Sequence, residues 1–340
     1  MLGAHYLDSD DIRGLANEPE FVDAVRTAYR EHGEGAPTHP RITLETEDPA
    51  GVLNSYMAIL PETGVMGGYM YSAGFADADA RFVTPIFDAE TGQPLAVVDG
   101  AYVNTHKTGA AGAVGIDALA RDDASTIAVI GSGAQARGQL RAAVTVRGID
   151  DVRVFSPTPE HRETFAAEMS ETVETDVRAV ESSAAAVDGA DIVITATNAS
   201  APVIDAETID AGTHINAIGQ YDPEKRELDA ETVRRAVYVP DLRARALQDA
   251  GSFLQAREAG VVDEEDIHAE LGAVVAGNAA GRTDRDEVTI FDSGGTALET
   301  LSAAALLYRR AIDAGNGTEI TLASASEVYT GKQHDTSEEL

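Results

Sequence analysis

Cysteine and tryptophan are absent from this chain of 340 residues, and lysine occurs only three times, as Lys107, Lys225 and Lys332. Without cysteine the chain forms no disulfide, carries no thiolate nucleophile and builds no cysteine-ligated metal site. Aromatic residues make up only 5% of a sequence that is 44% hydrophobic, so small aliphatic side chains must fill most of the core.

Long apolar runs and targeting signals are missing as well. No run of about 18 apolar residues occurs, and the first residues, MLGAHYLDSD, lack a basic segment followed by an apolar one. We therefore expect no membrane span, no secretion signal and a cytoplasmic location. The eight histidines show no metal-ligand spacing, so no metal is expected, and His214, in an apolar run, is predicted to be a satisfied core residue.

Negative charge dominates the composition. The chain has 58 acidic and 25 basic residues, a net charge of −33, and the acids are spread along its length. Such self-repulsion destabilises a compact state unless counter-ions screen it. The composition therefore predicts a protein adapted to a high-salt cytoplasm, and it argues against nucleic acid as a partner.

The order of sequence patterns predicts an α/β fold. The start is expected to be helical, including residues 18–33, and strand-like runs with turn signals between residues 41 and 98 predict a mostly antiparallel sheet. After Ser125 short apolar strands alternate with helices to about residue 295, which predicts a Rossmann-type, doubly wound parallel sheet. A long apolar helix is expected over residues 296–315, and the polar tail from residue 323 is expected to be frayed.

The segment TIAVIGSGAQARGQL carries the strongest motif. Gly131, Gly133 and Ala136 match the pattern G-x-G-x-x-G/A directly after a predicted strand and at the opening of a helix. The first glycine permits a tight turn, the second lets a pyrophosphate approach the backbone, and the alanine lets the helix pack closely. With Ala134 and Gln135 at the helix N-terminus, the segment predicts a dinucleotide site. The alternative is an ordinary glycine turn in an α/β domain.

The next strand bears on the choice of cofactor. It ends in Ser156 and Thr158, with Arg162 downstream, where an acid that binds the ribose of NAD commonly stands. Because that acid is missing, the sequence slightly favours NADP over NAD. The other residues expected to border the cofactor are Thr195 and Thr197 in TATNAS, and Ser293 and Gly294 in FDSGG. A glycine in FDSGG lets the backbone approach the flat nicotinamide ring.

Four segments in order, NTHKTGAAGAVGIDALA, IGSGAQA, INAIG…PEKRELD and FDSGGTALE, resemble the ornithine cyclodeaminase/mu-crystallin family. The resemblance implies an NAD(P)-dependent protein, since members include ornithine cyclodeaminases, alanine dehydrogenases and ketimine or imine reductases. It also implies a homodimer. The implied units are a substrate-binding and dimerisation domain of α+β type, residues 1–122 and 302–340, and a Rossmann domain, residues 123–301.

The resemblance also points to substrate residues. Arg41 and Lys107 match positions that hold the substrate α-carboxylate, although the family usually has arginine at the second. Lysine supplies a point charge at this position, whereas an arginine guanidinium would donate two parallel hydrogen bonds to the carboxylate. Tyr69 replaces a frequent lysine, and Tyr221 stands where the family has its catalytic aspartate, with Asp222 one residue further.

These departures leave the reaction open. The leading hypothesis is an oxidoreductase acting on the C–N bond of a small α-amino or α-imino acid, as alanine dehydrogenase or imine reductase. This reaction needs a cation that holds the substrate carboxylate, an apolar slot that presses the substrate Cα against the nicotinamide, and a proton donor for the substrate nitrogen. Tyr69 and Tyr221 are either proton donors or packing residues, and Asp222 acts only if its turn swings inward. The alternatives are ornithine cyclodeaminase, which forms proline and ammonia, and a non-catalytic NAD(P)H-binding protein.

Overall fold

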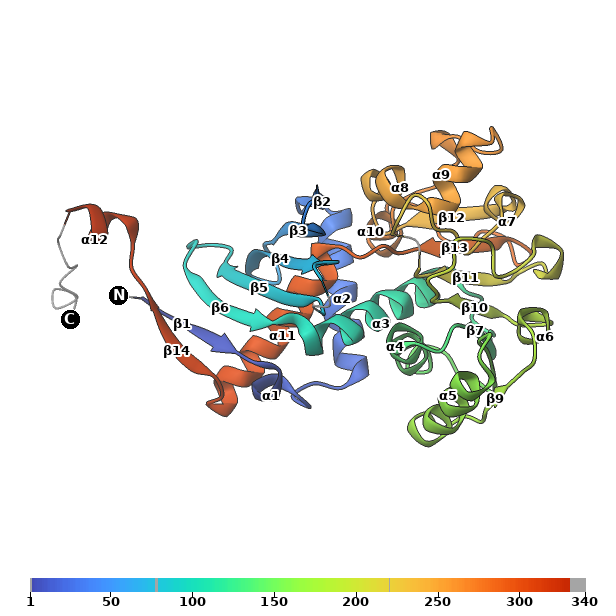
Figure 1. Cartoon of the computed structure of the whole chain (residues 1–340), viewed down its shortest axis with the longest axis horizontal. Helices are drawn as coiled ribbons and strands as arrows, with labels where there is room; N and C mark the ends of the chain where they lie inside the picture. The colour runs from blue at the N-terminus through green and yellow to red at the C-terminus, as the bar shows by residue number, and fades with distance from the viewer. Residues whose placement is uncertain (1, 77–78, 220, 331–340) are drawn as a thin grey trace.

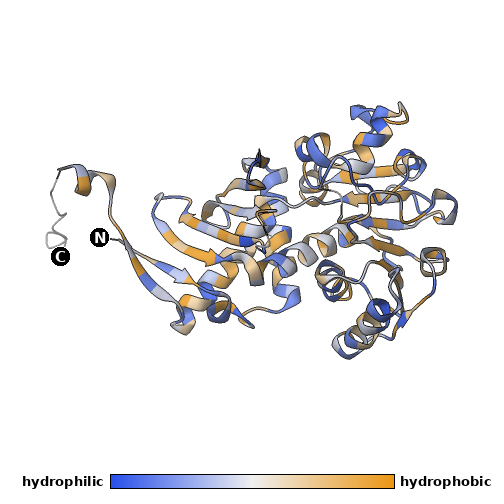
Figure 2. Cartoon of the chain, viewed as in Figure 1, coloured by the Kyte–Doolittle hydropathy of each residue, from blue (hydrophilic) through white to orange (hydrophobic). Residues whose placement is uncertain are grey.

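The computed structural model describes residues 2–76, 79–219 and 221–330, which form two seven-stranded sheets with their covering helices (Figure 1). Hydrophobic residues concentrate in the strands of both sheets and in the helices between them (Figure 2). No helix of the described part is both long and apolar enough to cross a membrane. In the same residues no group of three or more His, Asp or Glu side chains is arranged to hold a metal ion.

The first sheet has the strand order β14-β1-β6-β5-β4-β3-β2 and is antiparallel except for the parallel pair β1 and β6. Helices α2, α3 and α11 pack on one another beside this sheet. The bounds are β1 Leu2–Leu7, β2 Thr38–Glu47, β3 Ala50–Leu60, β4 Val65–Ala73, β5 Arg81–Asp88, β6 Pro94–Asp99, β14 Thr318–Leu322, α1 Ser9–Ile12, α2 Glu18–Gly33, α3 Gly100–Leu119, α11 Ala297–Ala314 and α12 Ala325–Thr330.

The second sheet is wholly parallel, with the order β12-β13-β11-β10-β7-β8-β9, which confirms the predicted Rossmann-type sheet. The strand order reverses between β7 and β10, and ligands of such sheets bind outside the carboxyl ends at this point. The bounds are β7 Thr126–Ile130, β8 Asp151–Phe155, β9 Val177–Ala179, β10 Ile192–Thr195, β11 His214–Ala217, β12 Ala236–Pro240, β13 Val288–Asp292, α4 Ala134–Ala143, α5 Pro159–Thr172, α6 Ser183–Val187, α7 Ala230–Arg235, α8 Arg243–Asp249, α9 Gly251–Glu258 and α10 Leu271–Val275.

Both chain ends differ from the sequence prediction. The helix expected over residues 18–33 is present as α2, but ahead of it the sequence did not predict the strand Leu2–Leu7, β1, which pairs in antiparallel fashion with Thr318–Leu322, β14. Among residues 3–7 of β1, Ala4 and Leu7 are buried, a spacing that lacks the alternation typical of a strand, and the antiparallel partner β14 lies at the other end of the chain. Of the tail, Ala325–Thr330 is a helix and residues 331–340 lie outside the described part. The domain boundaries remain a prediction, and the one at 301/302 falls within α11.

Glycines bring helices α3 and α4 into backbone contact. A Cβ atom at Gly109 would lie 2.4 Å from the carbonyl oxygen of Gly138, and one at Gly138 would lie 2.7 Å from the methyl group of Thr105. A side chain at either position would therefore push the helices apart. Because α3 leads from the first sheet to the second (Figure 1), this contact sets where Lys107 lies relative to the glycine turn between β7 and α4.

His214 is a satisfied core residue, as its sequence context predicted. Its Nδ1 lies 2.9 Å from the Thr289 hydroxyl and its Nε2 2.9 Å from Asn216 Oδ1, and the ring is fully buried. Burial lowers the pKa of His214 to about 3, so the ring is neutral at physiological pH.

Candidate active site

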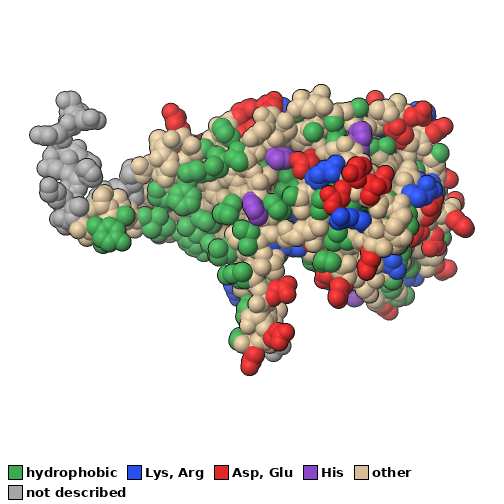
Figure 3. All heavy atoms as spheres, turned by 90° about the horizontal axis from the view of Figure 1, so that it is seen from above, with side chains coloured by type: hydrophobic (Ala, Val, Ile, Leu, Met, Phe, Trp, Pro, Cys, Tyr) green, Lys and Arg blue, Asp and Glu red, His purple; other side chains and the backbone are tan. Residues whose placement is uncertain are grey.

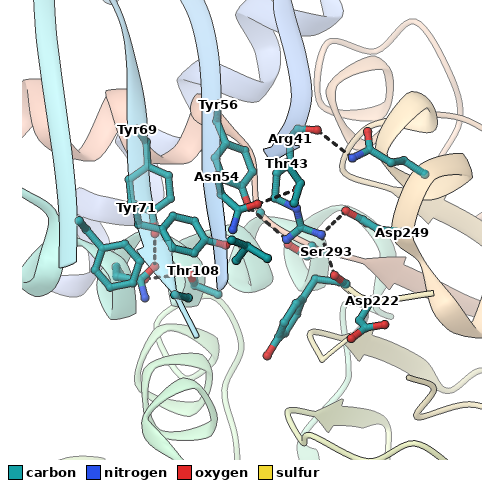
Figure 4. Close-up of a pocket in the computed structure, with 18 of the residues that line it drawn as sticks. Arg41, Thr43, Asn54, Tyr56, Tyr69, Tyr71, Thr108, Asp222, Asp249 and Ser293 are labelled. Atoms are coloured by element: carbon teal, nitrogen blue, oxygen red, sulfur yellow. Dashed lines mark hydrogen bonds and ion pairs between the residues drawn. The ribbon is translucent and has the colours of Figure 1, made fainter. Parts of the chain in front are cut away.

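A pocket of about 640 Å³ lies between the two sheets (Figure 4). Its walls come from strands of the first sheet, from α3, from the start of α4, and from loops that follow β11 and β13. The pocket thus opens at the carboxyl ends of the parallel strands, where ligands of such sheets bind. It brings together many residues to which the sequence points: Arg41, Tyr69, Lys107, Gln135, Tyr221, Asp222, Ser293 and Gly294.

The turn between β7 and α4 fits a dinucleotide pyrophosphate. Gly131 has φ of +116°, and a Cβ there would lie 2.4 Å from the Ala196 carbonyl oxygen, so only glycine makes the turn. Around Gly133 nothing lies within 4 Å of the Cβ position, which leaves room for an anion. Ala134 then opens α4, whose first N–H groups receive no hydrogen bond from a capping side chain at Gly133, and Ala136 is fully buried.

The end of β8 lies beside this turn, because the Gly131 N–H donates to the Phe155 carbonyl at 2.9 Å. Ser156 is buried, and its carbonyl accepts a hydrogen bond of 3.0 Å from Arg162 Nη1. Thr158 is exposed. Residues 156–158 contain no acid, so a guanidinium and two hydroxyl groups stand where a ribose or its 2′-phosphate would lie.

Thr195 and Thr197, at the end of β10, bind a buried acid that sequence reasoning missed. The Thr195 hydroxyl donates to Glu227 Oε2 at 2.8 Å, and the Thr197 N–H donates to Glu227 Oε1 at 2.6 Å. The Gly219 N–H, at the end of β11, also donates to Glu227 at 2.9 Å. Burial raises the pKa of Glu227, and these hydrogen bonds oppose the rise. Glu227 therefore ties two strand ends together, and Thr195 is fully buried in that contact.

The loop after β13 is held by a second buried acid. Asp241 Oδ2 accepts the N–H groups of Gly294 at 2.9 Å and Gly295 at 3.1 Å, while Asp241 Oδ1 accepts Arg245 Nε at 2.7 Å. Burial raises the pKa of Asp241 to about 6, although Arg245 opposes the rise. A Cβ at Gly294 would lie 2.8 Å from the Arg245 side chain, which explains the glycine. The Ser293 hydroxyl is buried without a partner among the described residues, as is Gln135 Oε1, so both remain able to bind a ligand.

Arg41 reaches the pocket from β2 and contacts the second sheet. Its Nη2 donates to Asp249 Oδ2 at 2.5 Å and to the Tyr221 carbonyl at 2.6 Å, and its Nη1 to the Tyr56 hydroxyl at 3.4 Å (Figure 4). The side chains of Arg41 and Asp249 are only 9% and 5% exposed. The Nε donor of Arg41 is buried and has no partner in the described part of the chain. Asp249 also accepts from Arg245 Nη1 at 3.4 Å, and no sequence motif had pointed to this residue.

Lys107 supplies the second buried cation of the pocket. Its Nζ donates to Glu299 Oε1 at 3.4 Å and lies 5.5 Å from the centre of the Tyr69 ring. Glu299 is fully buried and also closes the N-terminus of α11, accepting the Thr296 N–H at 2.9 Å and the Thr296 hydroxyl at 2.6 Å. The capping acid of α11 thus holds the lysine in place.

Tyr69 belongs to an aromatic wall of the pocket. Its ring stacks on Phe82 with centroids 5.4 Å apart and lies at 5.4 Å from Tyr56 and 5.5 Å from Tyr71. The hydroxyl contacts Asn104 Oδ1 at 3.4 Å. Burial raises the pKa of Tyr69 far above its usual value, so the hydroxyl stays protonated. Figure 4 shows Tyr56, Tyr69 and Tyr71 side by side along the pocket.

Tyr221 and Asp222 lie at the rim of the pocket. Tyr221 is 38% exposed, and its hydroxyl donates to Asn198 Oδ1 at 3.3 Å. Asp222 Oδ1 accepts the Glu224 N–H at 2.9 Å, and its Oδ2 lies 3.9 Å from Lys225 Nζ. In Figure 4 the Asp222 carboxylate points away from Arg41. Both side chains therefore have partners outside the pocket centre, and their catalytic roles remain predictions.

Comparison with known proteins agrees with this geometry. The model of the ornithine cyclodeaminase/mu-crystallin family matches residues 6–315. The alanine dehydrogenase of Archaeoglobus fulgidus is 33% identical over 318 residues, 92% of this chain and 97% of that protein. The structure of Thermococcus litoralis Δ1-pyrroline-2-carboxylate reductase with NADH and L-proline is 34% identical with a TM-score of 0.88, covering 93% of this chain and all of that one. An archaeal alanine dehydrogenase dimer with bound NAD is 31% identical with a TM-score of 0.88, covering 95% and 100% of the two chains. The chain belongs to the ornithine cyclodeaminase/mu-crystallin family.

Proposed function

We propose that the protein is an NAD(P)-dependent oxidoreductase that acts on the C–N bond of a small α-amino or α-imino acid, as an imine reductase or alanine dehydrogenase. One observation carries the proposal. Two buried cations, Arg41 and Lys107, line the same pocket as Gln135 of the nucleotide-binding turn and Ser293 of the loop after β13. The similar structures with NADH and proline and with NAD support it.

Each wall of the pocket has a task in this reaction. Arg41 and Lys107 bind the substrate carboxylate, and the Nε donor of Arg41 is available for it. The aromatic wall around Tyr69 excludes water and holds the substrate carbon against the loop at Ser293 and Gly294. Gly131 and Gly133 receive the pyrophosphate. The cofactor, when bound, supplies or accepts the hydride.

The pocket favours C–N oxidoreduction over ornithine cyclisation. By the family resemblance, cyclisation depends on an aspartate at the position where this chain has Tyr221, and a phenol there is a poor base for a substrate amine. Asp222 is bound to its own turn and to Lys225. For the cofactor we propose NADP ahead of NAD, because residues 156–158 after β8 supply two hydroxyl groups and no acid, and Arg162 of α5 donates to the Ser156 carbonyl.

An exposed apolar face supports a homodimer. Alternate residues of a strand point to the same side, and Leu44 pairs with Leu53, and Met70 with Val83, across neighbouring strands. Figure 3 shows hydrophobic side chains gathered over the first sheet, whereas acids crowd the other half of the visible face. We propose that two copies meet through this face. Its exposed members are Ile42, Leu44, Leu53, Met57, Ile59, Met70 and Val83.

Gly133→Asp tests the nucleotide site. The new side chain meets no protein atom within 4 Å of its Cβ but places bulk and negative charge where the pyrophosphate binds. We expect folding to be retained and the Kd for NADPH and NADH, measured by fluorescence titration, to rise at least ~100-fold. The control variant Gly148→Asp adds the same charge at an exposed, open position and should bind NADPH and NADH with the wild-type Kd. Unchanged affinity of Gly133→Asp would refute the site.

Lys107→Ala tests the proposed reaction. We expect kcat/KM for a small cyclic imino acid, and for pyruvate with ammonia, to fall by about 100-fold, because a buried charged hydrogen bond to the substrate carboxylate is lost. Lys107→Arg should retain more activity than Lys107→Ala. Lys225→Ala, at the rim, serves as the control. The assay follows NAD(P)H in molar KCl. Proline formed from ornithine without net NAD(P)H change would indicate the cyclodeaminase, and cofactor binding without turnover would indicate a binding protein.

Met57→Asp tests the homodimer. Met57 is 48% exposed on β3, and a carboxylate at the centre of a buried apolar interface carries a large desolvation cost. We expect the wild type to have the mass of a dimer by light scattering and the variant to have that of a monomer. Thr164→Asp, exposed on α5 beside the second sheet, should remain dimeric. A monomeric wild type would contradict the proposal.

We also propose that the protein works in a high-salt cytoplasm, and its stability should then depend on KCl. The net charge is −33, and raising ionic strength from 0.1 to 1 M shortens the Debye length from about 10 Å to about 3 Å. We expect the midpoint of chemical unfolding by urea to rise steadily over this range. A midpoint that stays constant or falls would show that charge repulsion does not limit stability.

A further inference from the structure

Asp249 is the buried carboxylate of the pocket wall. It is the last residue of α8, its side chain is 5% exposed, and Figure 4 shows it pointing toward Arg41. Among the described residues that line the pocket, the other carboxylates are Glu45, which is exposed, and Asp222, whose side chain is 39% exposed. Asp249 is therefore the least solvent-exposed of these three pocket-lining carboxylates.

The position of Asp249 relative to Arg41 brings it near a substrate nitrogen. Arg41 Nη2 lies 2.5 Å from Asp249 Oδ2, so both groups face the same part of the pocket. In an α-amino or α-imino acid the nitrogen and the carboxylate oxygens are separated by three bonds, about 3 Å. A substrate carboxylate on Arg41 thus carries its nitrogen to within hydrogen-bonding reach of Asp249.

Building on the proposed function, we propose that Asp249 is the catalytic acid that protonates the substrate nitrogen during imine reduction and takes this proton back in the reverse direction. The imine carbon gains a hydride, the C=N double bond becomes a single bond, and the nitrogen takes the proton of the Asp249 carboxyl group. The carboxylate that remains is reprotonated from water. The chain thereby supplies from α8 the acid that Tyr221 does not provide.

The charges around Asp249 support this role. From β2 it faces Arg41, within its own helix Arg245, and across Arg245 the carboxylates of Asp292 and Asp241. Burial raises the pKa of Asp249, and the two arginines oppose the rise. Three carboxylates share two guanidinium groups in this cluster. A substrate carboxylate on Arg41 neutralises the Arg41 guanidinium. This raises the pKa of Asp249 further and favours its protonated form when substrate is bound.

Other candidates are less well placed. The Tyr221 hydroxyl is bound to Asn198, and the Asp222 carboxylate caps its own turn. The Tyr69 hydroxyl contacts Asn104, and its ring lies against Lys107. None of these three groups contacts Arg41 through its polar side-chain atoms, whereas Asp249 does so directly.

Asp249→Asn tests the proposal, because the amide oxygen still accepts from Arg41 but the group no longer delivers a proton. We expect kcat for reduction of a cyclic imino acid to fall about 100-fold or more. The ionisation that limits wild-type kcat at high pH should disappear, and the solvent isotope effect should rise. NAD(P)H affinity by fluorescence should be unchanged. Glu45→Gln, which removes an exposed carboxylate of the pocket, is the matched control and should keep the wild-type rate and pH profile.

A second variant separates acid catalysis from structure. In Asp249→Ala, added formate should restore part of kcat in proportion to its protonated form, which a merely structural role does not predict. The proposal is overturned if Asp249→Asn changes only KM and keeps the pH profile, since Asp249 then only orients Arg41. It is also overturned if Asp222→Asn loses the ionisation instead. Absence of turnover in the wild type would overturn the proposed function and this inference with it, whereas an active wild type with unimpaired Asp249 variants would overturn this inference alone.

Discussion

The buried guanidinium of Arg245 organises the active-site side of this protein. It binds Asp241, Asp249 and Asp292, which come from the segment after β12, from α8 and from β13, and it is fully buried itself. Removing one partner from such a cluster leaves an uncompensated charge, at a cost of about 3–5 kcal/mol. Through Asp241 the cluster fixes the loop at Gly294 and Gly295, and through Asp249 it reaches Arg41 of the other sheet.

The two cations of the pocket are each held by an acid from a distant part of the chain. Arg41 is bound by Asp249, 208 residues away, and Lys107 by Glu299, 192 residues away. The glycine contact between α3 and α4 then sets the distance from Lys107 to the glycine turn between β7 and α4. In the proposed reaction, a substrate carboxylate competes with these resident acids, and binding is an exchange of ionic partners. This exchange links carboxylate recognition to the protonation of the neighbouring acid.

Much of the fold was readable because its signals are local. Alternating short strands and helices predicted the parallel sheet, and glycine spacing predicted the turn whose residue Gly131 has φ of +116°. The strands β1 and β14 were missed, because each is short, β14 is mostly exposed, and the two pair with each other across nearly the whole length of the chain, while β1 also pairs with β6. Glu227, Asp241 and Arg245 were missed for a related reason: in the sequence a buried acid or arginine looks the same as an exposed one.

By itself, the sequence determined the α/β class, the glycine turn between β7 and α4, the family, and the two departures at Tyr69 and Tyr221, since these depend on residue identity and spacing. Only the tertiary structure decided what those departures mean. It places Tyr69 in an aromatic wall and Tyr221 at a solvent-exposed rim, and it brings Asp249 against Arg41. The physical reason is that the pKa and the reactivity of an acid depend on its burial and on its charged neighbours. Both arise only when strands and helices far apart in the sequence pack together.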